Sequence, residues 1–172
     1  MGSDHCISES AVLYSYLDTR MVGAIMNRER AEKIFPAYFQ SIELPSEAIG
    51  QEIAVYRACP TRKIERASFL NSYEENNFRV PPDMDAGDPQ QYSLSTYKNV
   101  KDIRRFVVID SRYQPPWLLA KGHTTCEDGL SCETKAWKKG YRGSHVDWWL
   151  YEGAEPWAVF KEAVYDEERI SK

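Results

Sequence analysis

Residues 52–58, EIAVYRA, are the point at which the chain changes character. This short β-rich run is closed by Cys59-Pro60, a combination that predicts a strand followed by a turn. Further strands are predicted later in the chain, at 92–97 (YSLSTY), 106–110 (FVVID), 145–151 (HVDWWLY) and 157–160 (WAVF). FVVID is the clearest buried strand, and the last two stretches are expected to form an antiparallel pair.

The part of the chain before residue 52 has a helical pattern. Apolar residues recur at helical spacing over 10–26 and again over 31–39, where Pro36 predicts a kink or a new start. Helices followed by strands predict one α+β domain over 1–172, with a helical part at 1–50 and an α+β core at 51–172.

The segments between the strands are predicted from their turn and capping residues. Residues 62–75 predict a helix, and Asn99 predicts the N-cap of a short helix that ends near Arg105. Residues 79–91 and 113–132, rich in Pro and Gly, predict loops, the second uncommonly long.

Charge and composition exclude several classes of partner. The net charge of the 172 residues is −4, and Lys138, Lys139 and Arg142, beside Trp137 and Tyr141, are too few to predict a nucleic-acid groove. Nucleic acid is therefore disfavoured as a partner. No apolar run is long enough to cross a bilayer and the first residues are polar, so we expect no membrane partner and a cytoplasmic location.

Two groups of residues suggest a metal site or acid–base chemistry. The first group consists of His123, Cys126, Cys132 and His145, and its spacing is compatible with zinc ligation. Loop thiols and a partly buried histidine explain the same residues more simply. In a strand, His145 and Asp147 share one face, as a general-base pair or, in the favoured interpretation, as a buried polar pair.

A third group is distributed along the chain. Cleavage of a nicotinamide N-glycosidic bond requires a guanidinium for the diphosphate, a hydroxyl for the ribose and a carboxylate for the positive charge that develops on that ribose. Arg57, Ser95 with Thr96, and Glu155 supply these groups in that order, at or beside predicted strands.

The pieces that carry these residues are VYRA at 55–58, SLST at 93–96, and AWKKGYRG…EGAEPWAVF within 136–160. They resemble the arginine–serine–glutamate class of ADP-ribosyltransferase-like domains found among bacterial toxins and phage proteins. The resemblance implies N-terminal helices packed on a small, mostly antiparallel, split β-sheet, with NAD as the substrate. It implies cofactor contact by Arg57, a ribose-side role for Ser95 with Thr96, and catalysis by Glu155. The strand at 145–151 would then lie beside the cofactor cleft, where Trp148 or Trp149 would stack on a ring.

The pattern also departs from that class. The middle element is Ser-Leu-Ser-Thr, Arg142 stands where the class usually has Asp, Glu152 competes with Glu155 for the catalytic role, and Pro156 follows Glu155. An NAD-degrading relative of the class fits equally well, so transfer to a macromolecular acceptor, such as a protein, and hydrolysis both stay open. The alternative from a different class is a non-catalytic protein-interaction domain with a zinc-ordered loop.

Overall fold

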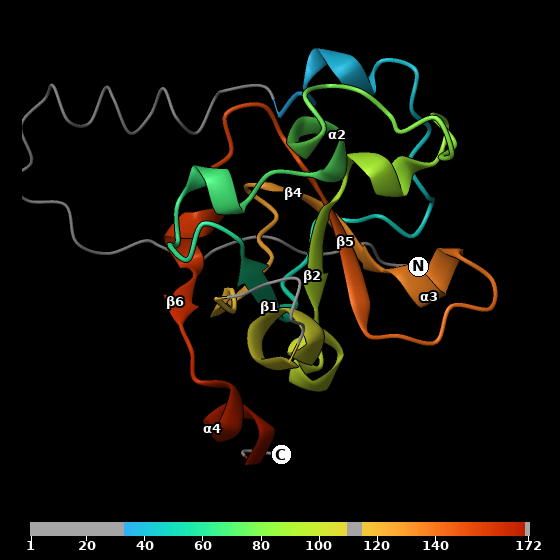
Figure 1. Ribbon diagram of the computed structural model, residues 1–172. Coiled ribbons are helices and arrows are strands. Elements are labelled where there is room, and N and C mark those ends of the chain that lie inside the picture. Colours follow the sequence, from blue (N-terminus) through green and yellow to red (C-terminus); the bar gives the residue numbers. More distant parts are fainter. Residues whose placement is uncertain (1–32, 110–114, 171–172) are drawn as a thin grey trace, which may run out of the picture.

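A six-stranded antiparallel sheet forms the centre of the molecule (Figure 1). The computed structural model describes residues 33–109 and 115–170, so the helix expected at 10–26 lies outside the described residues. The strands are β1 (Ala54–Cys59), β2 (Leu94–Tyr97), β3 (Leu118–His123), β4 (Gly129–Glu133), β5 (His145–Leu150) and β6 (Lys161–Glu162). Their order in the sheet is β4-β5-β2-β1-β3-β6. With short helices around it, the sheet confirms the α+β class.

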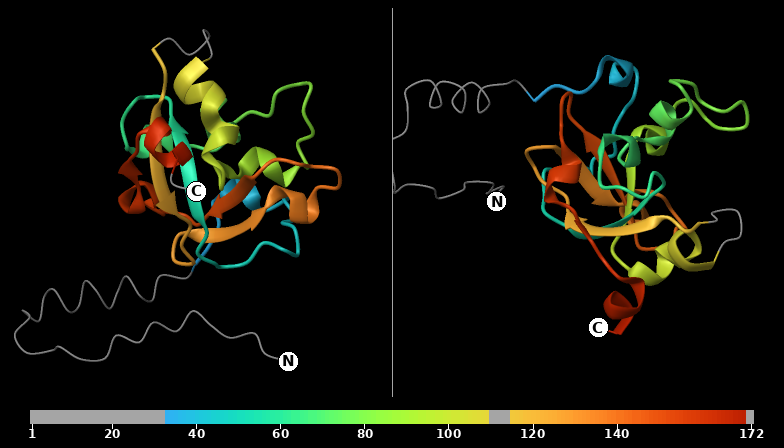
Figure 2. Two further views of the ribbon diagram at one scale, coloured as in Figure 1. Left: turned by 90° about the horizontal axis from the view of Figure 1, so that it is seen from below. Right: turned by 60° about the vertical axis from the view of Figure 1, so that its left-hand side comes forward.

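The sheet consists of two halves. β1 pairs with β3 over six register positions and β2 pairs with β5 over four, whereas Tyr56 opposite Tyr97 is the register position that joins β1 to β2. Figure 2 shows strands of the two halves running in clearly different directions, as in a strongly twisted sheet. The junction between the halves therefore lies at β1 and β2, which carry Arg57 and Ser95.

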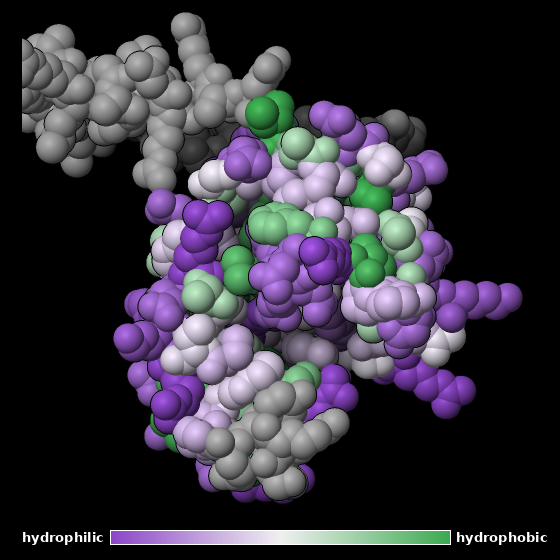
Figure 3. Space-filling model, turned by 45° about the horizontal axis from the view of Figure 1, so that its top comes forward, coloured by the Kyte–Doolittle hydropathy of each residue, from purple (hydrophilic) through white to green (hydrophobic). Residues whose placement is uncertain are grey.

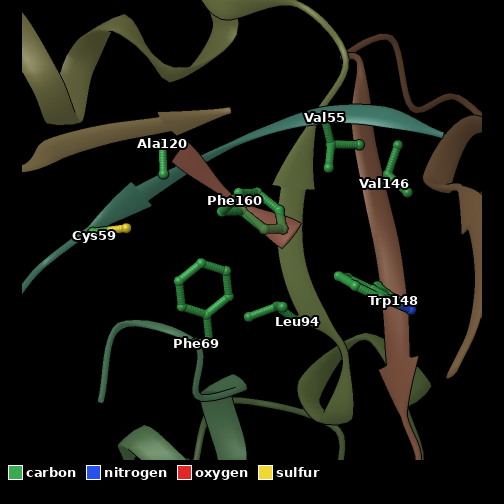
Figure 4. Packing of buried hydrophobic residues seen from close by; sticks show 8 residues of the cluster. All are labelled: Val55, Cys59, Phe69, Leu94, Ala120, Val146, Trp148 and Phe160. Carbon is green, nitrogen blue, oxygen red and sulfur yellow. The ribbon is translucent and has the colours of Figure 1, made fainter. Parts of the chain in front are cut away.

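Both faces of the sheet are buried. On one face, side chains from β1, β2, β3 and β5 pack with Phe69 and Phe160, whose rings meet edge to face at 4.9 Å (Figure 4). On the other face, Tyr56 and Ala58 of β1 pack against Val100 and Ile103. Alternation along β1 thus places apolar side chains on two cores, which explains why its sequence reads as a nearly continuous apolar run.

The helices of the described chain are short. The α-helices are α2 (Ser72–Glu75), α3 (Thr134–Trp137) and α4 (Tyr165–Ile170). The 3₁₀ turns are η1 (Ala37–Phe39), η2 (Arg66–Ser68), η3 (Pro89–Tyr92), η4 (Val100–Ile103) and η7 (Pro156–Val159), and η5 (Arg105–Ile109) is π-helical. Asn99 caps η4 as predicted, since its side chain accepts a hydrogen bond from the Lys101 amide at 3.0 Å.

Two predicted strands are wrong. FVVID is not a strand, because the chain continues from η4 into η5, and this helical segment packs Phe106 and Val107 on the second face while Val108 is exposed. The first three residues of WAVF lie in η7, which has Pro156 in its first turn, and β5 pairs with β2 and β4 instead. In both cases a run of β-prone residues forms a helical turn because tertiary packing outweighs local propensity.

Three other segments also differ from prediction. The expected loop 113–132 contains β3 and most of β4, the helix expected at 62–75 is divided between η2 and α2, and the stripe at 31–39 yields only η1 within its described part. Gly129 explains the first difference, because a Cβ there would overlap the carbonyl oxygen of Trp149. This glycine permits close approach of two strands rather than ending one.

The surface shows no extended apolar area on the face seen in Figure 3, where hydrophobic side chains form small patches among hydrophilic ones. Within residues 33–109 and 115–170, no helix combines the length and the apolar character that crossing a bilayer demands.

Candidate functional site

Arg57 on β1 is a buried arginine, 8% exposed, that binds the protein's own backbone. Its Nε donates to the carbonyl of Ser68 at 3.0 Å, and its two terminal nitrogens donate to the carbonyls of Ser95 and Leu70 at 2.8 and 3.2 Å. A fourth hydrogen bond reaches Glu75 at 3.3 Å. Four donor bonds within the protein leave this guanidinium little capacity for a diphosphate, so the predicted cofactor-binding role of Arg57 does not fit its surroundings.

Burial and charge act against each other at this ion pair. Burial lowers the pKa of Arg57 and raises the pKa of Glu75, and the contact between the two groups offsets part of each shift. An arginine retains its proton under such conditions, because its ordinary pKa is far above neutral. The Arg57 guanidinium therefore stays charged, and its contact with Glu75 ties β1 to α2.

Ser95 and Thr96 on β2 do not present their hydroxyls to Arg57. Because Tyr56 and Tyr97 are register partners and side chains alternate along strands, Ser95 projects from the face opposite to Arg57. Arg57 contacts the Ser95 carbonyl instead. Thr96 is fully buried, and its hydroxyl donates to the carbonyl of Val146 at 3.1 Å.

A cavity of about 600 Å³ lies among the loops beside the first core. Its walls come from three segments: residues 36–38 at the start of η1, the stretch from η2 to just beyond α2, and the loop from β5 into η7. Both competing glutamates, Glu152 and Glu155, line it, whereas Arg57 and Ser95 are not among its lining residues. The structure thus brings Arg57 next to the backbone of Ser95 and puts Glu155 at a different place.

The cavity wall carries aromatic rings and charged groups. The rings are those of Tyr38, Phe69, Phe78, Tyr151 and Trp157. Glu74 joins Glu152 and Glu155 as a third carboxylate, and the exposed Arg66 is a guanidinium at the same cavity. Concave sites of this size with rings and a few charged groups are typical places for small ligands.

Arg57 fixes the backbone of one wall of this cavity by hydrogen bonds. The two carbonyls that it binds in η2 and the following turn, those of Ser68 and Leu70, flank Phe69, which lines the cavity. Arg57 is therefore a positioning residue for this wall. The contact also explains why the segment 62–75 is not one continuous helix, since these carbonyls accept from a guanidinium rather than from helical amides.

A hydrogen-bonded group fixes another part of the wall. Asn71 accepts from the Glu74 amide at 2.9 Å, its own amide donates to Glu74 at 3.0 Å, and its side chain donates to the Tyr38 hydroxyl at 3.0 Å. Burial, with the nearby Glu74 charge, raises the pKa of Tyr38 to about 12. The phenol is neutral at physiological pH and rigidly held.

Phe78 stands at the end of this wall in an unusual conformation. Its φ is 59°, that of the preceding Asn77 is 55°, and its side chain is 60% exposed. A bulky residue rarely adopts this left-handed region, and such strain is frequently found at functional sites. Its ring lies 5.8 Å from that of Tyr73, edge to face.

Trp148 cannot take the stacking role predicted for it. Its side chain is fully buried in the first core, where it packs with Leu94 and Val146 (Figure 4). A ring that is enclosed by protein has no free face for a cofactor, so this prediction is wrong. The cavity wall instead carries four rings that are partly buried or exposed, those of Tyr38, Phe78, Tyr151 and Trp157.

His145 and Asp147 on β5 form the buried polar pair that the sequence analysis favours. Asp147 accepts from the hydroxyls of Ser93 and Thr134, each at 2.7 Å, and from the indole nitrogen of Trp137 at 3.1 Å. Thr134 also contacts Nδ1 of His145 at 2.6 Å. The single Thr134 proton goes to the carboxylate, so Nδ1 of His145 must donate to Thr134. Burial lowers the pKa of His145, which favours this neutral form.

The zinc alternative finds no support in the described residues. No cluster of three or more His, Cys, Asp or Glu side chains within residues 33–109 and 115–170 is arranged to hold a metal ion. Two of the four candidates have other surroundings: His145 contacts Thr134, and Cys126 donates to Glu127 at 3.2 Å. Burial raises the pKa of Cys132 to about 12, so it is a thiol at neutral pH.

Sequence reasoning missed most of the cavity wall. Asn71 and Glu74 had a signal, since Asn-x-x-Glu is a capping-box pattern that locates the start of α2. No sequence signal pointed to Arg66 and Phe78, because they reach the cavity through loops that meet only in the folded chain.

Comparison of the chain with family models, curated proteins and solved structures finds no match.

Proposed function

We propose that the cavity binds an NAD-type dinucleotide and that Glu155 assists the cleavage of its nicotinamide N-glycosidic bond. The observation that carries the proposal is the presence of Glu155, the carboxylate singled out by the sequence pattern, on the wall of a cavity lined by aromatic rings. NAD carries a flat cationic ring, ribose hydroxyls and a diphosphate. Aromatic rings and carboxylates attract the cationic nicotinamide ring, and a guanidinium suits the diphosphate.

In this proposal the diphosphate contact belongs to Arg66 rather than Arg57. Arg66 is exposed at the cavity, whereas Arg57 is committed to four internal acceptors. The proposal thereby keeps the chemistry expected from the sequence but assigns the guanidinium to a different residue. Arg57 acts through Phe69 and the turn around it.

The reaction follows from the charges. The bond between ribose C1′ and the nicotinamide nitrogen breaks, and nicotinamide leaves as a neutral ring with the bonding electron pair. Positive charge then develops on the ribose, where the Glu155 carboxylate stabilises it. Water, or a hydroxyl of an acceptor, attacks C1′ and loses one proton. Glu152 is the second carboxylate at the cavity and orients the attacking group.

The fold supports the proposal in one respect. The resemblance implies a split, mostly antiparallel sheet, and a sheet whose halves join at β1 and β2 is compatible with it. We therefore include an ADP-ribosyltransferase-like architecture in the proposal.

The test is release of nicotinamide from NAD by the purified chain. Glu155→Gln should reduce the rate by about 10²-fold or more, because it removes the charge that stabilises the positive ribose in the transition state. Arg57→Lys, which retains a cation outside the cavity, should reduce it far less. No release by the unmodified chain, or full activity in Glu155→Gln, would contradict the proposal.

A further inference from the structure

Two stretches of the chain that are separated in sequence carry a concentration of cations. The first follows β2 and contains Lys98, Lys101, Arg104 and Arg105. The second runs from the last residue of β4 through α3 and the loop before β5 and contains Lys135, Lys138, Lys139 and Arg142. Each stretch includes one carboxylate, Asp102 in the first and Glu133 in the second.

The fold brings these stretches together. β2 and β5 are antiparallel, with Tyr97 opposite His145, so the segment that leaves β2 and the segment that enters β5 lie at the same end of the sheet (Figure 1). The amide of Lys98 donates to the carbonyl of Ser144 at 2.9 Å, and the Ser144 amide donates to Asp102 at 2.9 Å. We call this combined surface, residues 98–106 and 133–144, the basic end.

The charge of the basic end differs sharply from that of the rest of the chain. Its eight cations and two carboxylates give +6. Because the whole chain carries −4, the remainder carries −10. Such a separation of charge produces a local positive potential that the net charge conceals, and it directs anionic partners to one place.

The cations of the basic end are accessible. Lys98 and Lys135 pair with Glu133, and Lys138 pairs with Asp88, but their side chains remain 43%, 55% and 41% exposed. The other five are exposed as well: Lys101, Arg104, Arg105, Lys139 and Arg142. Asp102 and Glu133 already accept hydrogen bonds from Ser144 and from Lys98, so the two carboxylates are held by the protein itself.

Aromatic rings alternate with these cations. Phe106 follows Arg105, whose guanidinium lies 4.5 Å from the ring centroid, and Trp137 precedes Lys138, whose ammonium lies 5.5 Å from its ring. Tyr141 precedes Arg142, and all three rings are partly buried. Phe106 is also stacked on Trp117, with ring centroids 5.2 Å apart, so the rings that remain for bases are those of Trp137 and Tyr141. Cations beside these partly buried rings match a strand of phosphates and unstacked bases, whereas an acidic polypeptide would make no use of the rings.

We propose that the basic end binds single-stranded nucleic acid, with the Lys and Arg side chains on phosphates and the rings on bases. This inference departs from the expectation drawn from net charge and the cluster at 138–142, because a second group of cations joins that cluster only in the folded chain. The cavity is lined by other segments, so this proposal is independent of NAD cleavage.

The test is fluorescence anisotropy with a labelled single-stranded oligonucleotide of about 16 nucleotides, a length that one small binding surface can accommodate. The variant Lys101→Glu/Arg104→Glu/Lys139→Glu/Arg142→Glu alters exposed side chains of the basic end. Arg105 is left intact because it hydrogen-bonds Tyr97. The control Lys63→Glu/Arg79→Glu/Lys161→Glu/Arg169→Glu makes the same change in net charge at exposed positions elsewhere.

The basic-end variant should weaken binding at least about tenfold and reduce the slope of log K against log salt by about 3, because four phosphate contacts on a single strand are lost. The control should retain most of the affinity. Equal losses in both variants, no binding by the unmodified chain, or preference for a polyglutamate peptide over the oligonucleotide would overturn the proposal. Should circular dichroism show that the fourfold variant is unfolded, Lys139→Gln/Arg142→Gln provides the same comparison with about half the change in slope.

Discussion

Asp147 and Glu155 are carboxylates on the same strand and the loop that follows it, yet their surroundings are opposite. Asp147 is fully buried and accepts three hydrogen bonds from Ser93, Thr134 and Trp137. Glu155 is exposed on a cavity wall. Asp147 is satisfied by the protein and holds the fold together, whereas Glu155 lies at a ligand-sized hollow, where a bound ligand can reach it.

The same contrast separates two arginines. Arg57 gives its donors to the backbone of β2, η2 and the turn after η2, whereas Arg66 is exposed at the cavity. The acceptors of an arginine thus identify it as structural or ligand-binding, and its place in the sequence does not reveal them.

The comparison predicts that Asp147→Leu is the most destabilising of these substitutions. It removes the acceptor of three hydrogen bonds, from the buried hydroxyls of Ser93 and Thr134 and from the partly buried indole of Trp137. We expect the free energy of unfolding to fall by about 3–5 kcal/mol in urea titrations. Glu155→Gln should change it by less than about 0.5 kcal/mol, as is usual for exposed positions. Similar effects at both positions would remove the distinction between them.

Arg57→Met sharpens the comparison of the two arginines. The carbonyls of Ser68, Leu70 and Ser95 lose their donor, which should cost about 2–3 kcal/mol of unfolding free energy. Arg66→Met should cost less than about 0.5 kcal/mol. If Arg57→Met unfolded at the same urea concentration as the unmodified chain, its structural role would be disproved.

Features whose causes lie within a few residues of sequence could be predicted, and features that depend on tertiary contacts could not. The strands around 52–58, 92–97 and 145–151 and the cap at Asn99 were predictable, because alternation and capping act over a few residues. FVVID failed because it continues the helical turn before it, and WAVF failed because Pro156 begins a helical turn there. The cavity could not be foreseen, because its three wall segments meet only through tertiary contacts.

Asn71→Ala tests whether the cavity wall is built by local capping. The substitution removes the cap of α2 and the hydrogen bond to Tyr38, so we expect a loss of about 1 kcal/mol. Asn76→Ala, which removes an exposed hydrogen bond to the Ser72 carbonyl after the same helix, is the matched control and should have a smaller effect. Chemical denaturation followed by circular dichroism measures both.

His145→Asn is expected to have the smallest effect on the free energy of unfolding at neutral pH, because asparagine retains a donor towards Thr134. Burial lowers the folded-state pKa of His145 below its ordinary value of 6.5, so the unfolded chain binds more protons once the pH falls below about 6.5. The unmodified protein should therefore lose stability as the pH is lowered from 7 to about 5. His145→Asn should flatten that dependence in thermal unfolding, and an unchanged profile would exclude His145 as its source.

The central claim, that the cavity is the dinucleotide site, is tested most directly by calorimetric titration with NAD of two matched variants. Ala154→Trp fills the cavity, whereas Ala158→Trp adds the same ring four positions later at an exposed site outside the cavity lining. We predict that Ala154→Trp weakens NAD binding at least about tenfold, equivalent to about 1.4 kcal/mol, and that Ala158→Trp leaves it unchanged. Equal binding by both variants, or no heat of binding from the unmodified chain, would contradict the claim.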